Sequence, residues 1–324
     1  EKIPEDLRKK IMIHCDVPLE GVLMVPTVAS IYEVPLILEE QGLAGLITDA
    51  MAIDVEDQKF GLNGWSDLVD LIKTPKERLK IAVVGKYVDL HDSYISVKEA
   101  LIHAGLFHSR DIEIDWIGAE DVEKDGAANY LSNADGIVVP GGFGYRGVEG
   151  MVDTVKFARE NNVPYLGLCL GMQVMVIEAA RNLLGKEGAN SSEFDSDTKD
   201  PVIDLMSDQL DVKEKGGTMR LGVYPCVIED GSIISRAYGK KRIMERHRHR
   251  FEFNNAYKED LKSVGLLPTG ISPDGRLVEI VEYKSHPFMA GTQFHPEFLS
   301  RPTKPHPLFR EFIAVAGGFE ANSR

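Results

Sequence analysis

Three short apolar segments, each running into a glycine-containing turn, constrain the fold of this chain more than any other feature. They are residues 81–84 (IAVV), 136–139 (GIVV) and 164–168 (PYLGL). A strand that is apolar at nearly every position is typical of a parallel sheet buried on both faces. Helical patterns lie between these segments, at residues 94–104 and 149–161. We therefore predict an α/β fold with a mostly parallel central sheet flanked by helices.

The chain divides near residue 75. Helical patterns occur before that point at residues 4–13, 29–41 and 65–72. Because these segments offer no convincing core, we predict that residues 1–75 are the end of a larger domain with its linker. Residues 76–324 are then a second domain. The sequence does not begin with methionine, and we expect an N-terminal portion of the natural protein to be missing from it.

Strand patterns dominate after residue 200. They lie at residues 219–228, 251–254, 277–283 and 288–294, and a closing helix is predicted at 307–315. We expect these strands to form an antiparallel or mixed extension of the parallel sheet. The polar residues 195–200 and the acidic residues 204–214 are typical of solvated loops.

Charge and composition exclude several partners. The chain has 324 residues and a net charge of −14, and non-specific nucleic-acid binding needs clustered Lys and Arg. We expect no nucleic-acid partner, although basic residues gather at 240–250. No apolar run approaches the roughly 18 residues of a membrane span, so we expect no membrane contact. The three cysteines lack pair or ligand spacing, which favours a reducing compartment over disulfides or a metal site.

Cys169 is the candidate nucleophile. It lies in the pattern G-x-C-x-G at residues 167–171, directly after an apolar strand and before a predicted helix. This is the thiol counterpart of the hydrolase nucleophile elbow, in which glycines allow a sharp turn that exposes the nucleophile. The N-terminus of the following helix would favour a thiolate. The alternative is a buried structural cysteine in a glycine-flanked turn.

A thiolate nucleophile needs a proton partner that is itself oriented. His295 and Glu297, in the motif QFHPEF, follow a predicted apolar strand. If that strand lies beside the strand before the cysteine, His295 can protonate the leaving group and Glu297 can fix the imidazole tautomer. His286 and His306 also precede proline, but no carboxylate stands two residues after either. Taken alone, a His-Pro-Glu sequence is equally typical of a surface turn.

Attack of a thiolate on an amide creates an oxyanion, which fixed donors must stabilise. The glycine-rich residues 140–144 (PGGFG) end another predicted parallel strand. We expect the backbone N–H groups of Gly142 and Leu170 to form the oxyanion hole. A tight turn that needs glycine for its backbone geometry would give the same sequence.

The elements PGGFG, GLCLG and FHPE, in this order, resemble the class I, triad-type glutamine amidotransferases, which have a flavodoxin-like fold. Longer motifs narrow the resemblance to the CTP synthase family. They are PGGFGYRGVEGM (140–151), PYLGLCLGMQ (164–173), GGTMRLG (216–222), ERHRHRFEFNN (245–255) and QFHPEF (293–298). The resemblance covers residues 79–316, and residues 30–43 are similar to the end of the family's amidoligase domain.

The resemblance implies a glutaminase that hydrolyses L-glutamine through a thioester on Cys169. In the full-length enzyme the ammonia would serve the ATP-dependent amination of UTP to CTP. ATP, Mg2+ and UTP would bind the amidoligase domain, and no G-x-x-x-x-G-K-[ST] phosphate loop occurs here. The resemblance further implies no metal or cofactor in this chain, the amidoligase domain as partner, a full-length homotetramer that can form filaments, and a cytoplasmic location.

Motif by motif, the resemblance also implies the residues that contact glutamine. They are Gly142, Leu170, Gln173, Glu193 and Arg250. A carboxylate at Glu193 suits the substrate ammonium, and a guanidinium at Arg250 suits its carboxylate. Without the resemblance, Arg246, Arg248 and Arg250 would be interpreted as a solvated basic strand end.

GTP activates this family near the domain junction, and GGTMRLG resembles the associated mobile lid. The resemblance therefore implies GTP contacts for Phe143, Thr218 and Arg220. Two other functions stay open at this point. One is a stand-alone γ-glutamyl hydrolase or peptidase on the same fold, and the other is a non-catalytic assembly module.

Overall fold

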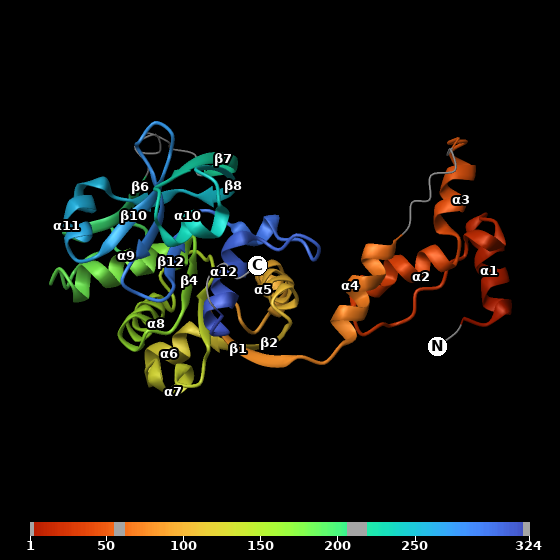
Figure 1. Ribbon diagram of the computed structural model, residues 1–324, viewed down its shortest axis with the longest axis horizontal. Helices are drawn as coiled ribbons and strands as arrows, with labels where there is room; N and C mark the ends of the chain where they lie inside the picture. The colour runs from red at the N-terminus through yellow and green to blue at the C-terminus, as the bar shows by residue number, and fades with distance from the viewer. Residues whose placement is uncertain (1–2, 55–61, 206–218, 320–324) are drawn as a thin grey trace. The chain divides into compact units, whose positions relative to one another are not determined.

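The computed structural model of the chain describes residues 3–54, 62–205 and 219–319. The chain forms two compact units, Glu1–Pro75 and Lys76–Arg324, and the colour bar of Figure 1 locates both by residue number. Among the described residues, no helix combines the length and the apolar character needed to cross a membrane.

The N-terminal unit is helical. Its helices are α1 Glu5–Cys15, α2 Val34–Glu40, α3 Leu43–Ala50 and α4 Asn63–Lys73. The indole Nε1 of Trp65 donates a hydrogen bond to the carbonyl of Tyr32 (2.7 Å), and the two rings meet edge to face. Among the described residues of this unit, the buried apolar side chains are Val22, Leu68 and Val69. Little hydrophobic core therefore forms within it.

The C-terminal unit is built around one mixed sheet. Its strands are β1 Glu77–Gly85, β2 Arg110–Gly118, β3 Gly136–Val139, β4 Tyr165–Leu168, β7 Arg220–Ile228, β8 Arg242–His249, β10 Leu266–Ile271, β11 Val278–Tyr283 and β12 Met289–Thr292. In the described residues their order is β2-β1-β3-β4-β12-β11-β10-β7-β8. The strands from β2 to β12 pair in parallel, and those from β12 to β8 pair antiparallel. The predicted fold class, a parallel sheet with an antiparallel extension, is confirmed.

Helices cover both faces of this sheet (Figure 1). They are α5 Ile95–Phe107, α6 Ala119–Asp125, α7 Ala128–Leu131, α8 Val148–Asn161, α9 Leu170–Asn182, α10 Ile233–Tyr238, α11 Lys258–Ser263 and α12 Pro307–Ala316. Side chains of α6 to α9 and α11 pack on one face, and those of α5, α10 and α12 pack on the other. In β1, Ala82 and Val84 join the first cluster while Ile81 and Val83 join the second. Because the strand is buried on both faces, every one of these positions is apolar.

A second, smaller sheet packs against helix α9. Its strands are β5 Asn190–Ser191, β6 Pro201–Leu205 and β9 Phe251–Phe253, in the order β5-β6-β9. Val202 and Ile203 of β6 and Phe253 of β9 belong to the same buried cluster as α9. This sheet therefore anchors the chain that follows β8 against α9.

Some sequence predictions for the second half were wrong. Strands β8 and β10 and helices α10 and α11 were not predicted, and α9 begins at Leu170 instead of after Gly171. Asp204 was predicted to lie in a solvated loop, but it belongs to β6 and accepts a hydrogen bond from the Ser192 hydroxyl at 2.6 Å. Residues 206–214 of the same predicted loop lie outside the described residues.

The carboxyl ends of β3, β4 and β12 lie side by side, because these three strands are neighbours in the parallel part of the sheet. The chain leaves β3 into residues 140–144, leaves β4 into Cys169 and leaves β12 toward His295. Ligands of open α/β sheets bind at this edge. The topology thus brings three separate motifs together.

Candidate active site

Cys169 occupies a strained turn between β4 and α9. Its backbone has φ 51° and ψ −96°, and it caps the N-terminus of α9. A non-glycine residue held outside the favoured regions costs about 1–3 kcal/mol and is typical of functional sites. A Cβ on Gly167 would lie 2.5 Å from the carbonyl carbon of Gly171, and a Cβ on Gly171 would collide with the carbonyl oxygen of Val139. Both glycines are therefore required by the close packing of this turn.

His295 reaches Cys169 because β12 pairs with β4. Thr292 is opposite Leu168 in the register, and the Cys169 N–H donates to the carbonyl of Thr292 at 2.7 Å. The backbone N–H of His295 donates to the carbonyl of Arg246 on β8 at 2.8 Å. The chain end of β12 is thus held between two strands, and the side chains of His295 and Cys169 both lie next to Gly141.

Glu297 holds the other side of the imidazole. It lies in the 3-10 turn Pro296–Leu299, and its Oε1 is 2.8 Å from Nδ1 of His295. Burial lowers the pKa of His295, but the charge and hydrogen bonds of Cys169 and Glu297 outweigh burial and raise that pKa to about 11. The imidazole therefore keeps its proton at neutral pH, next to the sulfur.

A small cavity opens in front of Cys169. Its volume is about 60 Å³, and it is lined by Gly142, Phe143, Cys169, Gln173, Glu193, Met219, His249, Arg250 and Phe251. The residues expected to contact glutamine are thus brought together, with the exception of Leu170, whose N–H lies in the adjoining turn. The amide of Gln173 donates to the carbonyl of Phe251 at 3.1 Å, and Glu193 accepts from the Gly144 N–H at 3.0 Å.

The two expected oxyanion donors belong to adjacent segments. A Cβ on Gly142 would lie 3.2 Å from Cδ2 of Leu170. Leu170 is the first residue of α9, so no carbonyl within the helix can accept its N–H. Lys86 supports the other segment, because its ammonium donates to the carbonyls of Phe143 and Gly144. Sequence reasoning did not single out Lys86.

Two of the three residues expected to contact GTP, Phe143 and Arg220, belong to the described part of the chain, and their surroundings differ. Phe143 is 46% exposed, and the guanidinium of Arg248 lies over its ring at 5.6 Å. Arg220 instead points into the protein, where its Nη1 lies 2.6 Å from Oε1 of the fully buried Glu279. Thr218 lies outside the described residues.

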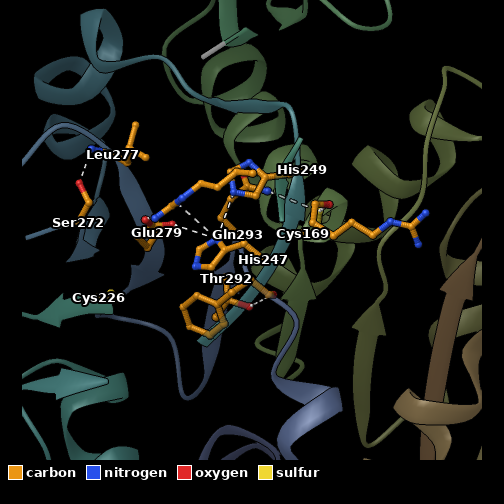
Figure 2. A network of polar contacts seen from close by, with 12 residues as sticks. Cys169, Cys226, His247, His249, Ser272, Leu277, Glu279, Thr292 and Gln293 are labelled. Atoms are coloured by element: carbon orange, nitrogen blue, oxygen red, sulfur yellow. Dashed lines mark hydrogen bonds and ion pairs between the residues drawn. The ribbon is translucent and has the colours of Figure 1, made fainter. Parts of the chain in front are cut away.

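Sequence reasoning missed a buried polar network behind the cavity, which Figure 2 displays. Side chains of β8 alternate between buried and exposed, so His247 and His249 point inward while Arg246 and Arg248 point outward. Nδ1 of His247 is 3.1 Å from Nε2 of His249, and His249 binds the carbonyl of Phe251 through Nδ1 at 3.0 Å. The alternation was visible in the motif ERHRHRFEF, but only its arginines were considered.

The same network contains a group with metal-ligand chemistry. One ligand atom from each of His247, His249 and Glu279 lies within 4.8 Å of the others. Nη1 of Arg220, however, lies 3.4 Å from Nδ1 of His247 and 2.6 Å from Glu279. A guanidinium already supplies the positive charge that the carboxylate needs, and a metal ion would lie against it. We therefore assign no metal to this cluster.

Comparison with known proteins identifies the family. The family model of class I glutamine amidotransferases matches residues 89–315, and that of the CTP synthase N-terminus matches residues 1–53. CTP synthase of Dehalococcoides mccartyi (strain ATCC BAA-2100) is 56% identical over 314 residues, 97% of this chain and 57% of that protein. CTP synthase of Roseiflexus castenholzii is 56% identical over 315 residues, 97% of this chain and 56% of that protein. The chain thus spans a little over half the length of these curated relatives.

A solved structure agrees with both the fold and the family. The glutaminase domain of Trypanosoma brucei CTPS, solved with bound acivicin, superimposes with a TM-score of 0.70 at 39% sequence identity. The match covers 75% of this chain and 95% of that one. The chain belongs to the class I glutamine amidotransferases and, within them, to the CTP synthase family.

Proposed function

We propose that this chain carries the glutaminase of a CTP synthase and hydrolyses L-glutamine to glutamate and ammonia. The observation that carries the proposal is Cys169, which caps α9 in a strained conformation near His295, itself oriented by Glu297. A buried structural cysteine needs neither the strain nor a protonated histidine partner. The strained backbone of Cys169 lowers the stability of the fold, and its function would be to present the sulfur to the cavity as a nucleophile.

In the first half of the reaction, the Cys169 thiolate attacks the side-chain carbonyl carbon of glutamine. A C–S bond forms, and the negative charge moves to the carbonyl oxygen, where the N–H groups of Gly142 and Leu170 stabilise it. The C–N bond then breaks as the His295 imidazolium donates its proton to the leaving nitrogen. Ammonia departs and a thioester remains.

In the second half, neutral His295 accepts a proton from a water molecule whose oxygen attacks the thioester carbon. The C–S bond breaks, glutamate leaves, and the thiolate and imidazolium are restored. One water is consumed for each glutamine. Glu297 transfers no proton in this scheme, because its role is to hold Nδ1 of the imidazole and to stabilise its charge.

Glu193 and Arg250 give the cavity its selectivity for an amino acid. Both line the cavity together with Gln173. We assign the substrate ammonium to the Glu193 carboxylate and the substrate carboxylate to the Arg250 guanidinium. Because Glu193 also accepts the Gly144 N–H, binding of the ammonium is coupled to the loop that carries the oxyanion donor Gly142.

In the whole protein, the ammonia would aminate UTP to CTP with ATP and Mg2+ at an amidoligase domain. Residues 1–75 would be the end of that domain, which agrees with the family match at residues 1–53. A cytoplasmic homotetramer with a capacity for filaments is the corresponding assembly. GTP would act as the activator, with Phe143 and Thr218 among its contacts.

The test is ammonia release from L-glutamine by this chain, with and without GTP, beside Cys169→Ala. We expect turnover in the wild type and its loss in the variant, with GTP increasing the rate. A chain that folds but releases no ammonia under any of these conditions would contradict the proposal. Turnover that is faster on γ-glutamyl peptides than on glutamine would instead support a γ-glutamyl hydrolase or peptidase.

Neither alternative is favoured by what is known of the chain. A γ-glutamyl hydrolase would share the Cys169 site, but it would not explain a match to CTP synthases over 97% of the chain. A non-catalytic assembly module would have no use for a protonated histidine held between a sulfur and a carboxylate.

A further inference from the structure

Gln293 is a buried side chain that touches the sulfur of Cys169 and has no role in the scheme above. It follows β12, and its side chain is fully buried. Its Nε2 donates a hydrogen bond to Sγ of Cys169 at 3.5 Å. Gln293 does not line the cavity in front of Cys169.

The orientation of the Gln293 amide is fixed by its neighbours. Gln173 donates one N–H to the carbonyl of Phe251 at 3.1 Å and the other to Oε1 of Gln293 at 3.3 Å. A backbone carbonyl can only accept, so the Gln173 amide must present its nitrogen to both partners. Oε1 of Gln293 is then the acceptor, and its NH2 group is directed at Cys169.

The backbone of Gln293 is fixed as well. Its N–H donates to the carbonyl of Glu279 on β11 at 2.8 Å. Figure 2 shows Gln293 between Glu279 on one side and Cys169 on the other. Because the main chain and the amide are both held, the donor meets the sulfur without a loss of side-chain freedom during the reaction.

The sulfur needs such a donor. Cys169 is 6% exposed, so little water can solvate a thiolate there. The carbonyl oxygen of Arg248, which carries partial negative charge, lies 4.0 Å from the same sulfur. A thiolate would be stabilised on one side by His295, and Gln293 supplies a second, neutral donor that stays in place when His295 gives up its proton.

We propose that Gln293 is a thiolate-stabilising residue, which holds the Cys169 sulfur in its ionised form and fixes its direction of attack. This inference rests on Cys169 as the nucleophile of the proposed function. It adds a donor that acts in both half-reactions, including the step in which the thioester sulfur leaves as a thiolate. The alternative is that Gln293 is merely a satisfied buried amide that fills space.

Alkylation of Cys169 distinguishes a thiolate-stabilising Gln293 from a space-filling one, and it does not require the protein to hydrolyse glutamine. The rate of iodoacetamide labelling, followed by mass spectrometry of the Cys169 peptide against pH, reports the ionisation of its sulfur. Gln293→Met has a similar shape but no donor. We expect its labelling midpoint to lie about one pH unit above that of the wild type, since hydrogen bonds to charged groups are the stronger ones.

A matched control is Thr292→Val, one residue earlier on β12. The Thr292 hydroxyl is buried and donates to the carbonyl of Phe294 at 3.0 Å, so its removal also deletes a buried hydrogen bond. Its side chain does not contact the sulfur in any described interaction. The ionisable groups around the cavity, His295, His249, Glu193 and Arg250, are unchanged in both variants, and we expect the control to keep the wild-type midpoint.

Glutaminase assays supply the second readout. For Gln293→Met we expect a roughly ten-fold lower kcat at pH 7, with partial recovery as the pH rises. If Gln293→Met does not fold, Gln293→Asn withdraws the same donor by one methylene and should show the same direction of shift. Wild-type and Met (or Asn) midpoints that coincide would overturn the proposal. Absence of glutamine turnover in a wild type whose labelling midpoint still responds to Gln293 would instead refute only the proposed function.

Discussion

Nδ1 of His295 lies 2.8 Å from Oε1 of Glu297, so a carboxylate two residues away in the sequence fixes the tautomer of the imidazole. The turn that allows this begins at Pro296, and the carboxylate is buried with Oε2 making no hydrogen bond to the described residues. Burying a carboxylate is costly, and the partner of Glu297 in the described contacts is the imidazole of His295. Its charge is directed at the group that must carry a proton.

The first prediction concerns this pair. Replacing Glu297 by Gln keeps the shape but removes the charge that stabilises the imidazolium. We expect kcat for glutamine hydrolysis to fall about 10⁴-fold, as it does when the orienting carboxylate of a serine-protease triad is removed. Steady-state ammonia release checks it. The exposed Glu187→Gln should retain wild-type kinetics, and equal activity of the two variants would remove Glu297 from the mechanism.

The second prediction concerns the tight turn around the nucleophile. A Cβ on Gly171 would collide with the carbonyl oxygen of Val139, and backbone cannot move aside cheaply. We expect Gly171→Ala to lower the free energy of unfolding by about 3 kcal/mol, the upper end for overpacking. Urea unfolding measures it. Gly188→Ala is the matched control, because no atom lies within 4 Å of its added Cβ.

The third prediction concerns Arg220, which the resemblance assigned to activator binding. Removing its guanidinium leaves the buried Glu279 uncompensated, and breaking a buried pair costs about 3–5 kcal/mol. Arg220→Met should therefore lower stability and basal glutaminase activity without GTP. Burial raises the pKa of Glu279 to about 7 against the effect of Arg220. The loss should be larger at pH 8 than at pH 6, because only the ionised carboxylate needs its partner.

A double variant tests the cause. Arg220→Met combined with Glu279→Gln should recover part of the stability, since no buried charge remains unpaired. A residue whose sole purpose was to contact an activator would leave both stability and basal activity unchanged. Unchanged stability and basal activity of Arg220→Met would therefore support a role of Arg220 in activator binding.

The parallel half of the fold was predictable because its signals are local. β1, β3 and β4 are apolar on both faces, and each ends at a turn that its glycines reveal. The elbow at Cys169 follows from such a turn. The positions of three motifs at one sheet edge then follow from the pairing of parallel strands.

The antiparallel half was harder because its partners are distant in the sequence. β8 alternates arginine and histidine, which by composition is a polar surface strand. His247 is buried against Tyr224 of β7, Glu279 of β11 and Phe294, and Glu279 meets Arg220 across 59 residues. Gln293 could not be distinguished from any other polar residue, since its importance depends on the position of Cys169.

The last prediction concerns the acid side of the stability profile. Burial lowers the pKa of His247 to about 2 and that of His249 to about 3, with the charge of Arg220 acting in the same direction. Both histidines stay neutral in the folded protein, while in the unfolded chain they ionise near their ordinary pKa of 6.5. Between these values the unfolded state binds more protons, so stability falls as the pH decreases from about 6.5.

For each histidine, the loss between pH 6.5 and pH 5 should be about 1.5 kcal/mol. Urea unfolding of the wild type and of His247→Gln at both pH values measures it. His247→Gln lowers the free energy of unfolding at neutral pH because it disturbs the network. Between pH 6.5 and pH 5, however, the variant should lose about 1.5 kcal/mol less stability than the wild type. A slope that His247→Gln leaves unchanged would mean that His247 is protonated in the folded protein, with its charge balanced by the carboxylate of Glu279, 3.6 Å away.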